Sequence, residues 1–273
     1  MRPESMSNSW KLDAIDSAAP PPREVLGGSL ADERLELPDA TQRKLFGFNS
    51  SDRRSRPFNL LRSQVLKIAK ANGWKIIGVT SATPDVGKTF IASNLAASMS
   101  RIPDQYTLLF DFDLRRSSVG KCFGLEEGPG IGDYLTGETD TLDAVGHNVA
   151  GTGLIVFPAA QIVRQSAEAL AGNRMKSLIE AMRGLGENCF CLCDLPPAFA
   201  NDDASIVVQQ IDAYLLVVEE GKTTARQVRD AMEVLSPAPC IGTVLNRYHG
   251  AIGGDDYGFG YWTQRYYDAY YQE

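Results

Sequence analysis

The tripeptide Gly87–Thr89 carries the strongest chemical signal in this sequence, at the end of the segment SATPDVGKT. The run before this segment, Lys75–Thr80, is short, apolar and β-branched, which predicts a buried strand. Apolar residues then recur at helical spacing through Ile91–Met99. A loop that leaves a strand and opens a helix can direct backbone N–H groups, and the positive end of the helix dipole, at a polyphosphate. We therefore expect a phosphate-binding loop, although Ala82 replaces the first glycine of the G-x-x-x-x-G-K-S/T pattern.

Each residue of this loop has an expected role toward a nucleotide and Mg²⁺. Gly87 lets the backbone approach closely, Lys88 reaches the β- and γ-phosphates, and the hydroxyl of Thr89 can ligate the metal. Val86 and Phe90 complete the predicted nucleotide-binding loop. The alternative is an ordinary corner between a strand and a helix.

Three aspartates follow two other predicted strands. The strand Tyr106–Phe112 ends in the motif DFD, with Asp111 and Asp113, and the strand Cys189–Cys193 is followed by Asp194. Ligands of open α/β sheets lie at the carboxyl ends of the strands. Beside a phosphate loop, the pair predicts one carboxylate near Mg²⁺ and one near an attacking hydroxyl, and Asp194 has the place of a Walker B aspartate. The alternatives are an exposed acidic loop and a strand that ends in aspartate by chance.

The elements that position these residues alternate between strands and helices. Helices are expected at Phe58–Ala71, Ile91–Met99, Ala167–Leu185, Asp202–Gln210 and Lys222–Leu235. Further strands are expected at Leu154–Phe157, at Ala213–Val218 and at Ile241–Leu245, which ends in Asn246 and Arg247. This alternation predicts right-handed βαβ units, and hence a mostly parallel, doubly wound α/β sheet with helices on both faces, the fold of a P-loop NTPase.

Composition narrows the class of protein. The chain has 273 residues, of which 44% are apolar. Its net charge of −7 gives no sign of a basic surface for binding nucleic acid. No apolar run approaches the roughly 18 residues of a membrane span, so we expect a cytoplasmic protein. The five cysteines are expected to be reduced, and the alternating three in CFCLCD to be small buried residues on one face of a strand.

The predicted nucleotide-binding domain covers residues 56–250. The segments on either side of it lack the apolar periodicity of helices or strands. Residues 1–55 contain PPP and GGS and are expected to be a flexible tail. The arginines at 53, 54 and 56, where this tail meets the domain, are either solvated or a docking patch. Residues 251–273 hold six of the ten tyrosines, among glycines and acids. The tyrosines of this tail are Tyr257, Tyr261, Tyr266, Tyr267, Tyr270 and Tyr271. Such a tail is either a low-complexity segment or an array of phosphate acceptors.

From about Phe58 to its end, the chain resembles the bacterial tyrosine kinases (BY-kinases) of capsule and exopolysaccharide export. The resemblance includes SATPDVGKTF, LLFDFDLRR, FGLEEGPGIGDYLTGE, FPAAQIVRQSAEAL, CLCDLPP, LLVVEEGKTT, VLNR and the tyrosine cluster. Each segment alone is common. Their order, and DFDLRR together with the tyrosine tail, are specific.

The resemblance implies an ATP-dependent, autophosphorylating protein tyrosine kinase that regulates exopolysaccharide polymerisation and export. The residues implied in catalysis are Lys88, Asp111, Asp113 and Asp194; those implied in Mg²⁺ binding are Thr89, Asp111 and Asp194. Asn246, near the adenine, and Arg247 would help the phosphate loop to bind ATP. The six tail tyrosines would be acceptors in trans, in a ring of subunits.

Partners follow from the same resemblance. A separate transmembrane polysaccharide co-polymerase would recruit the chain to the inner membrane and activate it, and a tyrosine phosphatase would reverse the reaction. The ring contact is in question, because Arg62 alone is kept from the E-x-x-R-x-x-R motif of relatives, with Arg56 and Asn59 at two of the other positions.

Two alternatives to the kinase function remain. One is a Min- or Par-type positioning ATPase, which would have lysine at the position of Thr83. The other is a nucleotide-binding regulator of export that transfers no phosphate.

Overall fold

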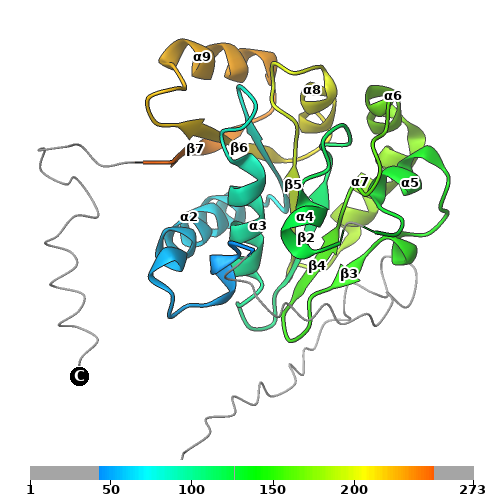
Figure 1. Ribbon diagram of the computed structural model, residues 1–273, viewed down its shortest axis with the longest axis horizontal. Helices are drawn as coiled ribbons and strands as arrows, with labels where there is room; N and C mark the ends of the chain where they lie inside the picture. The colour runs from blue at the N-terminus through cyan, green and yellow to red at the C-terminus, as the bar shows by residue number, and fades with distance from the viewer. Residues whose placement is uncertain (1–42, 126, 249–273) are drawn as a thin grey trace, which may run out of the picture.

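A seven-stranded sheet forms the centre of the fold, with helices on both of its faces (Figure 1). The computed structural model describes residues 43–125 and 127–248. Most of the predicted N-terminal tail, and the C-terminal segment with its six tyrosines, lie outside these residues. None of the described helices is long and apolar enough to cross a lipid bilayer.

The strands are β1 Ile76–Ser81, β2 Tyr106–Asp111, β3 His147–Asn148, β4 Leu154–Phe157, β5 Cys189–Asp194, β6 Ala213–Glu219 and β7 Cys240–Asn246. The α-helices are α2 Arg56–Asn72, α3 Lys88–Met99, α4 Val119–Phe123, α5 Ile131–Thr136, α6 Ser166–Ala171, α7 Asn173–Gly184, α8 Asp203–Val208 and α9 Ala225–Val234. The 3₁₀ turns are η1 Phe46–Phe48, η2 Arg53–Ser55 and η3 Leu142–Ala144.

The sheet has the order β3-β4-β2-β5-β1-β6-β7, and neighbouring strands are parallel except β3 and β4. The predicted mostly parallel, doubly wound α/β fold is therefore confirmed. Strands β1, β2 and β5 end at the same edge, and the register of β2 and β5 sets Asp111 directly beside Asp194. Helix α3 begins at this edge, directly after the predicted phosphate loop (Figure 1).

Strand β5 shows how sequence alternation builds the two layers of the core. Phe190 and Leu192 pack in the hydrophobic cluster that includes helices α2 and α3. The three cysteines between and beside them pack in the cluster on the opposite face, with helices α7 and α8. This confirms the prediction that they share one face. Burial raises the pKa of the thiols of Cys191 and Cys193, which favours the protonated form.

Helices α6 and α7 and the strand β3 differ from the sequence prediction. The single helix expected over Ala167–Leu185 is divided into α6 and α7, because Gly172 between them is extended, with φ −72° and ψ 170°. The strand β3 was not predicted, since its two residues, antiparallel to β4, are too few to show a periodicity.

The segment 43–55, which the sequence assigned to the flexible tail, is ordered against helix α3 (Figure 1). Leu45 is buried, and the buried amide of Asn94 on α3 holds the backbone on either side of it. Asn94 donates to the carbonyl of Lys44 at 2.9 Å and accepts from the N–H of Gly47 at 3.0 Å. The folded domain therefore begins before residue 56, the predicted boundary. The sequence shows no apolar periodicity there, because hydrogen bonds from the Asn94 side chain hold this segment.

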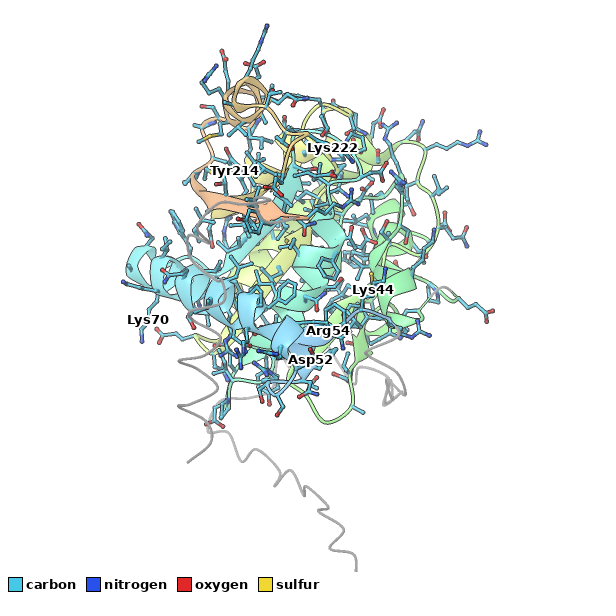
Figure 2. All side chains as sticks on the ribbon, turned by 60° about the vertical axis from the view of Figure 1, so that its left-hand side comes forward. Lys44, Asp52, Arg54, Lys70, Tyr214 and Lys222 are labelled. Carbon is cyan, nitrogen blue, oxygen red and sulfur yellow. The ribbon has the colours of Figure 1, made fainter. Side chains whose placement is uncertain are left out.

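In the same segment, one arginine of the predicted basic cluster makes contacts within the fold. The guanidinium of Arg54 pairs with Asp52 at 2.6 Å (Figure 2). It also lies over the ring of Phe46, 4.1 Å from the ring centroid. Phe46 in turn packs edge-on against Phe90, the residue that follows Thr89. Arg54 thus has contacts within the fold as well as with solvent.

Candidate active site

The loop between β1 and α3 has a conformation that requires glycine at its end. Gly87 has φ +94°, in the left-handed region. A Cβ atom there would overlap the side-chain amide of Asn246, at the end of β7. Asn246 donates from Nδ2 to the carbonyl of Val86 at 2.8 Å, so the end of β7 is fixed against the loop. Gly87 is therefore necessary both for its backbone angle and for the close approach of Asn246.

Lys88 begins helix α3 and turns its ammonium group into the site. The side chain is buried, and Nζ donates to Oδ2 of Asp113 at 2.7 Å. Burial alone would lower the pKa of Lys88, but the attraction of Asp194 and Asp113 outweighs it and raises that pKa. The site therefore holds a fixed positive charge next to one of its predicted catalytic carboxylates.

Thr89, the next residue of helix α3, contacts Asp194 at the end of strand β5. Thr89 Oγ1 donates to Oδ2 of Asp194 at 2.5 Å. Asp194 is fully buried, and its other oxygen, Oδ1, has no hydrogen-bond partner among the described residues. Burial raises the pKa of Asp194 to about 6, although Lys88 and the Thr89 hydroxyl oppose this. A buried carboxylate oxygen without a donor, beside a hydroxyl, has the ligand chemistry that suits Mg²⁺.

Asp111 is also fully buried, directly beside Asp194. Its Oδ2 accepts from the backbone N–H groups of Ser118 and Val119, both at 3.0 Å, and its Oδ1 from that of Asp113 at 3.2 Å. Burial, and then the charge of Asp194, raise the pKa of Asp111 to about 7. Asp111 thus shapes the loop that carries Asp113, a structural role that the sequence did not reveal.

The described residues include no group of three or more His, Cys, Asp or Glu side chains arranged for a metal ion. Mg²⁺ is commonly bound by one or two carboxylates together with substrate phosphates. Thr89 and Asp194 are the residues whose free or exchangeable oxygens fit such a metal best.

A groove of about 330 Å³ begins at the other side of the phosphate loop. The predicted nucleotide-binding residues Phe90, Asn246 and Arg247 line it together, with Phe58 and Tyr248. Arg247 is held at this position by an ion pair of 3.0 Å with Glu219. Its lining combines apolar side chains with the amide of Asn246 and the guanidinium groups of Arg54 and Arg247. The structure thus brings these three residues to one groove beside the loop.

Two arginines of the motif DFDLRR lie at the rim and were not singled out from the sequence. Arg116 pairs with Asp85 of the phosphate loop at 2.8 Å, and both side chains are exposed. Arg115 instead contacts Ser166 and the buried Asp203, which begin helices α6 and α8. The sequence shows no signal for this contact, because NDD at 201–203 does not indicate which aspartate is buried.

No family model matches the chain. Among curated proteins, the tyrosine-protein kinase Etk of Escherichia coli K12 is 34% identical over 173 residues, which are 63% of this chain and 23% of that protein. The chain thus spans about a quarter of Etk's length. The tyrosine-protein kinase CpsD of Streptococcus agalactiae is 26% identical over 229 residues, 82% of this chain and 95% of that protein.

Solved structures give the same picture. The kinase domain of Escherichia coli ETK matches with a TM-score of 0.68 and 29% identity, over 80% of this chain and 84% of that one. MinD of Pyrococcus horikoshii, complexed with Mg-ADP, matches with a TM-score of 0.55 and 19% identity, over 65% and 72%. The second match shows the fold alone. Together with the curated relatives, the first confirms the resemblance that the sequence motifs indicated.

Proposed function

Since this chain is a relative of the bacterial tyrosine kinases, we propose that it is an ATP-dependent protein tyrosine kinase. One observation carries the proposal: Lys88, Asp113, Thr89 and Asp194 converge at the phosphate loop, as two hydrogen-bonded pairs. Such a site offers a cation for phosphate, oxygen ligands for a metal, and a further carboxylate for the attacking group.

The two pairs suggest a division of roles. The loop N–H groups and Lys88 bind the β- and γ-phosphates of ATP, and Thr89 and Asp194 hold Mg²⁺, with Asp111 behind them. Mg²⁺ bound there supplies positive charge that stabilises the transferred phosphoryl group. Because Lys88 can pair with phosphate oxygens, it is expected to release Asp113 when ATP binds.

Asp113 is then the base that accepts the proton of the acceptor hydroxyl. A tyrosine hydroxyl has a pKa of about 10, so it needs a nearby base or cation to react at neutral pH. Asp113 is only 3% exposed, so bulk water screens its interaction with a bound hydroxyl weakly. The nucleotide base occupies the groove at Phe90, Asn246 and Arg247.

The acceptors in this proposal are the six tail tyrosines of another copy of the chain. Each phosphate would add a charge of about −2, so that neighbouring subunits in a ring would repel one another and the assembly would limit itself. A transmembrane co-polymerase would recruit and activate the chain, a phosphatase would reset it, and the cycle would gate exopolysaccharide export.

The usual ring contact is altered in this chain. Arg62, the residue kept from the relatives' motif, donates to the carbonyl of Ser98 at 2.8 Å, at the end of helix α3. Asn59, at another position of the motif, accepts from the hydroxyl of Ser98 at 3.0 Å. Both side chains are thus engaged within the domain, so a ring of these subunits would need other contacts.

The test is to incubate the purified chain with Mg-ATP, with and without the cytosolic segment of the co-polymerase, and to probe for phosphotyrosine. Signal that is lost in Lys88→Met, but kept in the exposed control Lys176→Met, would support the kinase. ATP hydrolysis without phosphotyrosine would instead indicate a positioning ATPase, and nucleotide binding with neither would indicate a regulator that transfers no phosphate.

A further inference from the structure

Buried side chains hold Arg115 at the rim of the site. Its Nε donates to Oγ of Ser166 at 2.8 Å and to Oδ2 of Asp203 at 3.3 Å. Ser166 donates in turn to the same oxygen of Asp203 at 2.7 Å, and Asn201 donates to it from Nδ2 at 3.0 Å. Asp203 and Ser166 are fully buried. Because a guanidinium is planar, fixing Nε in this way fixes the orientation of the whole group.

The outer edge of this guanidinium faces solvent. The side chain of Arg115 is 48% exposed, and Nη1 and Nη2 have no hydrogen-bond partner among the described residues. Arg116 is different, since it already pairs with Asp85. The backbone N–H of Val163 donates to the carbonyl of Leu114 at 3.0 Å, which brings the exposed Arg164 close to the same loop. A preorganised cation is therefore available here to an anion from outside.

The position of Arg115 suggests which anion. Arg115 follows Asp113, the proposed base, by two residues, so their Cα atoms are at most about 7 Å apart. In an extended peptide, a residue one or two positions from a tyrosine is displaced by about 3 to 7 Å along the chain. The spacing between the tyrosine and such a carboxylate thus matches the spacing between the Cα atoms of Asp113 and Arg115. Two free N–H groups on one edge suit bidentate binding of a carboxylate.

The C-terminal segment contains this pattern. Its acidic residues are Asp255, Asp256, Asp268 and Glu273, against one arginine, Arg265. Five of its six tyrosines have an aspartate or glutamate within two residues. Tyr261 is the exception, with Phe-Gly before it and Trp-Thr after it. The segment therefore offers acid-flanked acceptors and one internal comparison.

We propose that Arg115, positioned by Ser166 and Asp203, is a specificity-determining residue that binds a carboxylate flanking the acceptor tyrosine. The proposal rests on the kinase function above and adds the substrate class, a tyrosine with an acidic residue one or two positions away. Charge-assisted contacts at a half-exposed arginine are expected to favour such a peptide about tenfold.

The test compares two synthetic peptides of residues 252–260, IGGDDYGFG and the same peptide with both aspartates changed to asparagine. Binding of labelled peptides to the full chain loaded with Mg-ADP is measured by fluorescence anisotropy, and phosphorylation by kcat/KM with Mg-ATP. The acidic peptide is expected to bind about tenfold more tightly. This ratio is expected to fall to about one in Arg115→Gln and to about three in Ser166→Ala, which leaves the arginine charged but less well oriented. It is expected to stay near ten in Arg226→Gln, a matched change on helix α9.

Equal binding of the two peptides to the unaltered chain, or an unchanged ratio in Arg115→Gln, would overturn the proposal. The kinase function and the role of Arg115 are tested by different outcomes. Phosphorylation without preference for the acidic peptide refutes the role of Arg115 and leaves the kinase. Preferential binding that depends on Arg115, without any phosphorylation when the cytosolic segment of the co-polymerase is present, refutes the kinase and leaves recognition of the acidic segment. Mapped self-labelling adds a further check, since Arg115→Gln is expected to reduce labelling least at Tyr261.

Discussion

Asp194→Asn is expected to stabilise the nucleotide-free protein at pH 8, although it removes a residue of the proposed metal site. In the folded chain the Asp194 carboxyl is fully buried, and its Oδ1 has no hydrogen-bond partner among the described residues. Burial raises the pKa of this group from 3.8 to about 6. The folded state therefore favours the neutral carboxyl, which asparagine imitates, and Thr89 can still donate to the amide oxygen.

The size of the effect follows from the two pKa values. A difference between 3.8 and about 6 corresponds to about 3 kcal/mol at 1.36 kcal/mol per pKa unit. Because the folded pKa is raised, the folded chain binds more protons than the unfolded one between these values, and stability falls as the pH rises through them. The gain from asparagine is therefore about 2 to 3 kcal/mol at pH 8 and falls to about 1 kcal/mol near pH 4.5. At pH 8 it raises Tm by roughly 4 to 10 °C.

The assay is urea unfolding of the nucleotide-free chain at pH 8 and near pH 4.5, with Mg-ADP titration calorimetry on the same samples. Asp104→Asn is the matched control, since Asp104 is exposed in the loop before β2. It is expected to change neither stability nor binding. A less stable Asp194→Asn protein at pH 8, or an equal gain at both pH values, would contradict the cost assigned to the buried Asp194 carboxylate. Unchanged Mg-ADP binding would refute its place in the metal site.

Four further outcomes are expected. Gly87→Ala should weaken Mg-nucleotide binding at least tenfold in calorimetry and destabilise the fold by about 1 to 3 kcal/mol in urea, because φ is +94° and Asn246 fills the space. Asn94→Ala should cost about 1 to 3 kcal/mol and speed amide exchange at Gly47, whose N–H loses its acceptor. Asp113→Asn should lower phosphotyrosine formation at least a hundredfold on immunoblots, while nucleotide binding stays mostly intact. Changing the six tail tyrosines to phenylalanine should remove most labelling and leave the circular dichroism spectrum unchanged.

The parts of the site that are local in sequence could be predicted. The predicted phosphate loop is a contiguous motif, so the strand before it and the helix that begins at Lys88 could be predicted from spacing alone. Asp111 and Asp194 end apolar runs, and because parallel strands end at the same edge of a sheet, their approach follows from the fold. Alternation along β5 likewise indicated that its cysteines share one face.

The parts that depend on long-range polar contacts could not be predicted. Asn94 fixes a segment about fifty residues earlier, and Asp203 fixes an arginine 88 residues earlier, and neither contact leaves a period or a motif in the sequence. Gly172 divides the predicted helix because its backbone is extended. The apolar residues on either side of it still follow helical spacing, so the sequence pattern does not show the break. The roles of the six tail tyrosines stay a prediction, because they lie outside the described residues.

Transfer of phosphate between two copies of the chain tests the central proposal most directly. One copy carries Lys88→Met and keeps its tail tyrosines; the other keeps Lys88 and has phenylalanine at all six tail positions. Mixed with Mg-ATP and the cytosolic segment of the co-polymerase, the Lys88→Met copy is expected to acquire phosphotyrosine that neither copy shows alone. No label in the mixture, under conditions in which the copy that keeps Lys88 binds Mg-nucleotide and the unaltered chain labels itself, would contradict transfer in trans.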